Sequence, residues 1–107
     1  MGKILISHRG NTDSKIEERE NHPDYIDEAI YLGFDVEIDV WVKNNFIFLG
    51  HDGPQYKINL SWIKERSNKL WIHCKNIQAL ELFYSIGYNI NYFWHENDTV
   101  TLTSKKY

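Results

Sequence analysis

Residues 34–41 read FDVEIDVW, and this alternating stretch decides the fold class. A period of two predicts a β-strand, with successive side chains on opposite faces. One face is therefore apolar, and the other carries Asp35, Glu37 and Asp39. The simplest explanation is a solvated face of an edge strand. The alternative is that Glu37 and Asp39, two residues apart on one face, reach a single hard cation.

Strands and helices alternate around this stretch. Short apolar runs predict further strands, at residues 3–7, 46–49, 70–74, 90–94 and 100–103. The long polar segment 9–22 reads as a loop, and 43–45 as a hairpin turn. Helices are expected from Pro23 to Gly33, over residues 60–66, and from a cap at Asn76 to residue 86.

This order predicts βαβ units and a mostly parallel sheet. A complete (β/α)₈ barrel takes about 250 residues, whereas this chain has 107. The expected fold is therefore α/β, a partial (β/α) TIM-barrel-like domain with mostly parallel strands. A single domain is expected over residues 1–107.

Composition excludes several classes of protein. The net charge is −3, so the chain lacks the basic footprint of a nucleic-acid binder. The single cysteine, Cys74, rules out an intrachain disulfide and fits a reducing compartment. Neither a signal peptide nor an apolar run of about 20 residues is evident. A soluble cytoplasmic protein without a membrane span is the expectation.

Polar side chains gather where the predicted strands end. His8 and Arg9 follow the first strand, and His73 and Lys75 lie two apart at the end of the LWIHC strand. Ligands bind at the carboxyl ends of strands in α/β architectures. Taken singly, three of these residues also have a structural explanation. His8 is then a strand-end histidine bonded to backbone, His73 an interior histidine, and Lys75 a lysine near the cap of the next helix.

His51 directly follows the apolar run FIFLG and therefore lies in a turn at the end of a predicted strand. An ordinary imidazole titrates close to neutral pH, so His8 and His51 could act together as a general acid and base. A plain turn residue is the alternative for His51.

Four motifs occur in order along the chain: His8-Arg9-Gly10, Glu20-Asn21, Glu37-x-Asp39 and His51-Asp52. This constellation resembles the glycerophosphodiester phosphodiesterase family, phospholipase-C-like enzymes with a TIM barrel. The resemblance covers roughly residues 3–76. It implies the following roles: catalysis by His8 and His51, metal binding by Glu37 and Asp39, phosphate binding by Arg9, support of the site by Glu20, and a substrate-binding lysine at Lys75.

The chain departs from the family at His73, where the family carries a third acidic metal ligand. The resemblance implies Mg²⁺ or Ca²⁺, which prefer oxygen ligands, whereas an imidazole ligand suits Mn²⁺ or Zn²⁺ better. Either His73 shifts the metal preference, or it does not bind the metal.

The expected function is a metal-dependent hydrolase that acts on a glycerophosphodiester or related small phosphodiester. A non-catalytic phosphate- or metal-binding module of the same fold is the main alternative, and a phospholipase acting on membrane lipid is a third. Because an incomplete barrel exposes strand edges, a homo-oligomer is expected as well. The polar side chains of His95, Glu96 and Asp98 either line the same mouth or form a surface turn.

Overall fold

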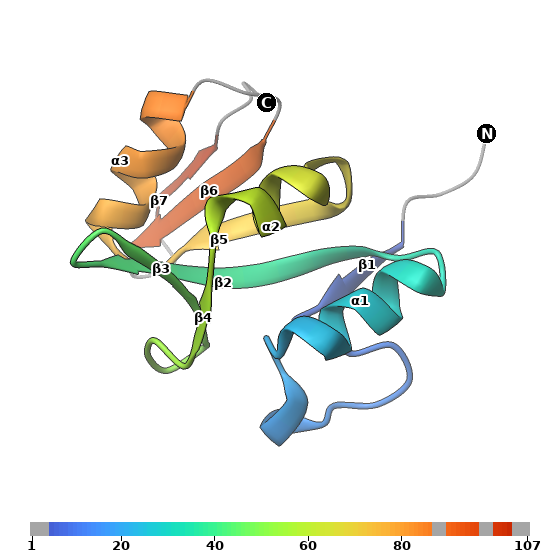
Figure 1. The fold of residues 1–107 in the computed structure, drawn as a ribbon. Helices are drawn as coiled ribbons and strands as arrows, with labels where there is room; N and C mark the ends of the chain where they lie inside the picture. Colours follow the sequence, from blue (N-terminus) through green and yellow to red (C-terminus); the bar gives the residue numbers. More distant parts are fainter. Residues whose placement is uncertain (1–4, 87–89, 97–99, 104–107) are drawn as a thin grey trace.

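The computed structural model describes residues 5–86, 90–96 and 100–103 (Figure 1). Within them lie seven strands, three α-helices and two short 3₁₀ helices. The strands are β1 (Ile6–His8), β2 (Asp35–Lys43), β3 (Phe46–Leu49), β4 (Tyr56–Ile58), β5 (Leu70–Cys74), β6 (Asn91–Glu96) and β7 (Val100–Thr103). The helices are η1 (Glu17–Arg19), α1 (Pro23–Tyr31), α2 (Leu60–Glu65), η2 (Ser67–Lys69) and α3 (Ile77–Ile86).

The strands form one sheet in the order β4-β3-β2-β5-β6-β7, and β1 also pairs with β2. β1 is parallel to the first part of β2, in the register His8 to Glu37, and β3 is antiparallel to its second part. β5 lies parallel to β2, with Asp39 opposite His73, and β6 lies parallel to β5. β2 is thus the central strand, and its neighbours bring their polar ends to it.

The prediction of a TIM-barrel-like domain with mostly parallel strands is wrong. The sheet is open and mixed, since β2–β3, β3–β4 and β6–β7 are all antiparallel pairs. Local turn chemistry explains one of these pairs: Asn44 and Asn45, at the predicted hairpin turn, both adopt positive φ, which matches the tight turns that join antiparallel strands. The sequence analysis also missed β4, whose three residues carry too little pattern to identify a strand.

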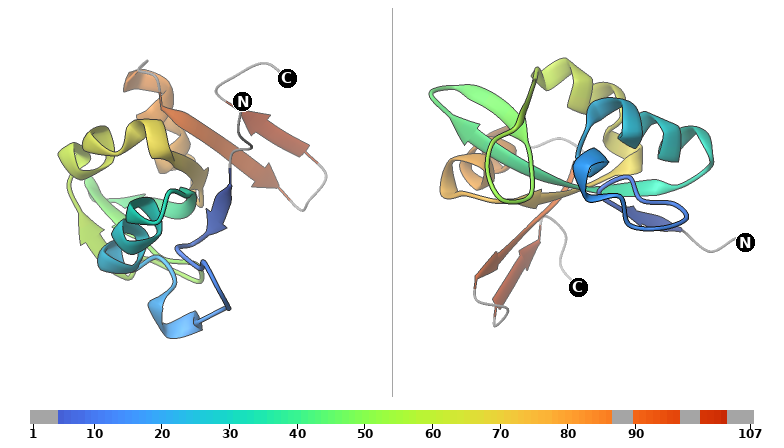
Figure 2. Two further views of the ribbon diagram at one scale, coloured as in Figure 1. Left: turned by 90° about the vertical axis from the view of Figure 1, so that its right-hand side faces the viewer. Right: turned by 90° about the horizontal axis from the view of Figure 1, so that it is seen from below.

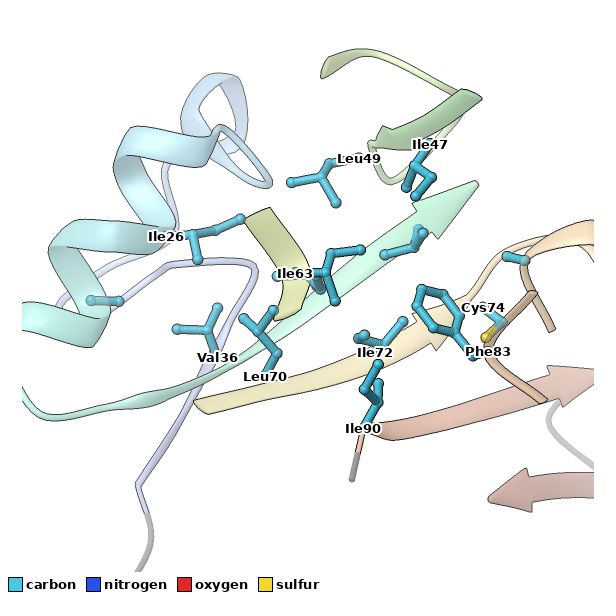
Figure 3. Packing of buried hydrophobic residues seen from close by; sticks show 14 residues of the cluster. Ile26, Val36, Ile47, Leu49, Ile63, Leu70, Ile72, Cys74, Phe83 and Ile90 are labelled. Atoms are coloured by element: carbon cyan, nitrogen blue, oxygen red, sulfur yellow. The ribbon is translucent and has the colours of Figure 1, made fainter. Parts of the chain in front are cut away.

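The helices pack on one face of the sheet. Val36, Ile38 and Val40 of β2 are fully buried there in one apolar cluster with Ile26 of α1 and Ile63 of α2. Figure 3 shows Val36, Ile26 and Ile63 of this cluster. Figure 2 shows α1 and α2 on the side of β2 away from the β6–β7 pair. The strand period of two therefore directs the alternate residues of β2, including its acids, to the opposite face.

The predicted helix boundaries are largely confirmed. Pro23 is the first residue of α1, and Gly33 follows its end with a φ of 96°. The Asn76 side chain accepts a hydrogen bond from the backbone N–H of Ala79 in the first turn of α3. Among the described residues, no helix combines the length and apolar character that crossing a membrane requires.

Candidate functional site

Two acids of β2 lie on the sheet face opposite the helical layer. In the strand registers, Glu37 lies opposite His8 of β1, and Asp39 lies opposite His73 of β5. The Glu37 side chain is 24% exposed and that of Asp39 is completely buried. The two carboxylates therefore share a face but have very different environments.

Glu37 pairs with the first predicted catalytic histidine. Its Oε1 lies 2.9 Å from Nε2 of His8. The His8 side chain is 57% exposed, so its ring is accessible from solvent. A carboxylate on one ring nitrogen fixes the orientation of an imidazole and directs its other nitrogen outward.

Asp39 lies at the centre of a buried polar cluster. Its Oδ1 is 3.0 Å from Nδ1 of His73, and its Oδ2 accepts a 2.9 Å hydrogen bond from the Asn21 amide. Nε of Arg9 lies 2.9 Å from the same Oδ2, but its N–H is not aimed for a hydrogen bond, so this contact is an ion pair only. Nδ1 of His51 lies 3.5 Å from Oδ2, also without a hydrogen bond.

These contacts keep Asp39 ionised. Burial alone would raise the pKa of its carboxyl group. Hydrogen bonds from His73 and Asn21, together with the positive charge of Arg9 and the electrostatic interaction with His73, outweigh burial and lower that pKa to about 2. The buried carboxylate is therefore a fixed negative charge.

Arg9 is held between two acids in the loop after β1. The backbone N–H of Arg9 donates to the Glu37 carbonyl over 2.8 Å, and its guanidinium Nη1 donates to Oε1 of Glu20 over 3.2 Å. Asn11 donates to the other oxygen of Glu20 over 2.8 Å. Burial would raise the pKa of Glu20, but these two donors lower it overall. Glu20 therefore holds the Arg9 guanidinium in position.

His51 stands at the start of the loop between β3 and β4. The Gly50 carbonyl accepts a 2.7 Å hydrogen bond from the Trp41 indole, which anchors the loop to β2. A side chain at Gly50 would meet the carbonyl oxygen of Gly53 at 2.0 Å, so the tight loop requires glycine there. Packing of this loop against β2 places the imidazole beside Asp39.

A polar hollow of about 470 Å³ opens between the two loops. Arg9 and Glu20 line it on one side and His51 on the other, together with surface residues of both loops: Lys15, Glu17, Asp52, Gly53, Pro54 and Gln55. His8 and Glu37 do not belong to its lining. A small polar molecule in the hollow would contact Arg9 and His51 directly.

Lys75 and His73, like His8 and Glu37, do not line this hollow. Nζ of Lys75 is 6.0 Å from the centre of the Trp41 ring, and Lys75 does not line the hollow. The His73 ring stacks on Phe93 at 5.0 Å, with the two planes 7° apart, while its Nδ1 faces Asp39. The side chains of residues 95, 96 and 98, named above as possible neighbours of the site, lie outside the described part of the chain.

The arrangement of these side chains does not fit a divalent cation. Both Asp39 oxygens already accept contacts from nitrogen donors, and His73 presents its Nδ1 to Asp39. Within the described residues, no group of three His, Cys, Asp or Glu side chains could hold a metal ion. The metal site at Glu37, Asp39 and His73 stays a prediction, because a cation there would have to displace these nitrogen donors from Asp39.

The sequence analysis gave no role to Asn21 or Asn11, both of which contact the site. Their signal was weak, because asparagines in a polar loop are ordinary. Only the position of Asn21 next to Glu20, inside one of the four motifs, singled it out.

No protein-family model, curated protein or solved structure matches the chain.

Proposed function

We propose that the chain is a phosphodiester hydrolase that uses His8 and His51 as general acid and base on a glycerophosphodiester or related small phosphodiester. One observation carries this proposal: two carboxylate–imidazole pairs, Glu37 with His8 and Asp39 with His51, lie on one face of one strand. Because a strand rises about 3.3 Å per residue, the two acids are roughly 6.5 Å apart along β2.

An in-line displacement at phosphorus needs a proton donor and a proton acceptor on opposite sides of the phosphoryl group, so the bound phosphate would have to reach from the hollow to the exposed ring of His8. One imidazole takes the proton of the attacking oxygen, and the other protonates the leaving oxygen. Glu37 orients the His8 ring, and each carboxylate stabilises the imidazolium that forms beside it.

Arg9 supplies the positive charge. Its guanidinium lines the hollow beside His51, where it can bind the phosphoryl oxygens as negative charge develops on them. The contacts to Glu20 and Asp39 hold the arginine in position before substrate arrives. The polar lining of the hollow favours a substrate with polar rather than acyl substituents on the phosphate.

The test is turnover of bis-p-nitrophenyl phosphate and glycerophosphocholine by the wild type, His8→Ala and His51→Ala. His22→Asn is the matched control, because His22 lies outside the hollow, where it caps α1 through Nδ1 and packs edge-on against Tyr56, and asparagine is a preferred cap. Each assay is run in EDTA and with Mg²⁺, Ca²⁺, Mn²⁺ or Zn²⁺, which also tests the predicted metal.

Removal of either site histidine should reduce kcat by about 10²–10⁴-fold, with the control unchanged. The absence of turnover under every metal condition would refute the hydrolase. Phosphate binding without turnover would then support the non-catalytic binding module.

A further inference from the structure

Asn21 is the most completely buried polar side chain of the site apart from Asp39. It has no exposed surface, and its backbone φ is 65°. A buried asparagine in this conformation carries a cost in both desolvation and backbone strain, so its contacts need an explanation.

Those contacts join the two segments that build the site. The side-chain amide donates to Oδ2 of Asp39 over 2.9 Å, and the side-chain oxygen accepts from the Asp39 backbone N–H over 2.9 Å. The backbone N–H of Asn21 donates to the Arg9 carbonyl over 3.0 Å. One residue thus binds the carboxylate, the backbone of β2 and the loop of Arg9.

Asparagine suits this position for two reasons. Its amide offers a donor and an acceptor side by side, which the Asp39 carboxylate and N–H require together. It also adopts positive φ more readily than most other residues that have a side chain. Aspartate would retain the acceptor but place a second negative charge against Asp39.

We propose that Asn21 is a positioning residue: it aims the Asp39 carboxylate at His51 and His73 and fixes the Arg9 loop beside it. The inference rests on the proposed function for its catalytic consequence, but the positioning itself is a property of the folded protein. Loss of the amide frees Asp39 to rotate, so His73 loses its hydrogen-bond partner and His51 loses the carboxylate that lies 3.5 Å from its Nδ1.

The test compares Asn21→Gly with the wild type. Glycine tolerates the positive φ, so the substitution removes the side chain without adding backbone strain. Asn44→Gly is the matched control, because Asn44 has a φ of 53° in the β2–β3 turn, far from Asp39 in the sheet. Asn21→Asp is a second variant that preserves the shape, in case the glycine variant does not fold.

Two measurements are made on the folded variants: ring ¹⁵N shifts of the histidines by NMR, and steady-state kinetics. Asn21→Gly and Asn21→Asp should both move the His51 and His73 ring signals and leave those of His22 unchanged. Where turnover is measurable, kcat should fall about 100-fold, whereas Asn44→Gly leaves both measurements at wild-type values.

The proposal is overturned if the His51 and His73 signals stay at their wild-type positions in a folded Asn21 variant. This result is independent of catalysis. A wild-type protein without turnover would refute the hydrolase but leave the NMR comparison intact, so the two failures are distinguishable.

Discussion

The buried Asp39 carboxylate should make folding stability depend on pH in a way that Asp39→Asn removes. Its pKa falls from 3.8 to about 2 in the folded protein. Each pKa unit corresponds to about 1.4 kcal/mol, so the ionised carboxylate contributes about 2 kcal/mol to the free energy of unfolding at neutral pH. Asp39 has no exposed surface, so solvent does not screen this contribution.

The direction of the pH dependence follows from the difference between the folded-state and unfolded-state pKa values of Asp39. Because the pKa of Asp39 is lower in the folded state, its contribution to stability is fully present at pH values above the unfolded pKa of 3.8. The contribution is lost as the pH falls through the folded-state pKa of about 2. Between pH 7 and pH 2.5, about 1–2 kcal/mol of this contribution should disappear.

The assay is urea unfolding of the wild type, Asp39→Asn and the control Asp52→Asn at pH 7 and pH 2.5. The Asp52 side chain is completely exposed, so Asp52→Asn reports the effect of the substitution alone. The stability difference between the wild type and Asp39→Asn should shrink by about 1–2 kcal/mol on acidification. An equal difference at both pH values would refute the argument that donors around Asp39 hold it ionised.

Three further substitutions test the framework around the site. Gly10→Ala should lower the free energy of unfolding by about 1–3 kcal/mol, because Gly10 has a φ of +94° and the new Cβ would lie 2.7 Å from the Tyr25 ring. Thermal unfolding measures this loss, and an unchanged Tm would contradict the geometry. Ile63→Ala should cost about 2–5 kcal/mol in urea unfolding, because Ile63 is fully buried between α2 and the sheet, and a loss below 1 kcal/mol would show that the core is loosely packed there. Trp41→Phe removes the hydrogen bond from the indole to the Gly50 carbonyl and should reduce kcat more than it reduces stability. Steady-state kinetics and thermal unfolding measure the two effects. A variant with wild-type kcat would mean that this hydrogen bond does not position His51.

Much of the fold could be predicted from local pattern. The alternation in residues 34–41 identified β2, and Pro23, Gly33 and Asn76 marked helix ends correctly because each has a specific backbone role. The arrangement of the strands could not be predicted in the same way. Whether neighbouring strands run parallel depends on long-range pairing, which an alternation of strands and helices does not determine.

The candidate site was likewise predicted where local pattern decides the position of a residue, and not where long-range contacts decide it. Strand parity correctly put Glu37 and Asp39 on one face, and strand ends brought His8 and His73 beside them. The sequence could not show that Asp39 is buried among nitrogen donors, because that environment comes from Asn21 in a distant loop. Lys75 shares the parity of His73, yet its long side chain extends over Trp41 instead of into the hollow.

The most direct test of the two imidazole–carboxylate pairs is the tautomer of each histidine, read from ¹H–¹⁵N long-range NMR spectra of the wild type at a pH where the rings are neutral. His8 should carry its proton on Nε2, facing Glu37, and His51 should carry its proton on Nδ1, facing Asp39. A proton on Nδ1 of His8 together with one on Nε2 of His51 would show that the rings turn away from the acids, and the account would then be wrong.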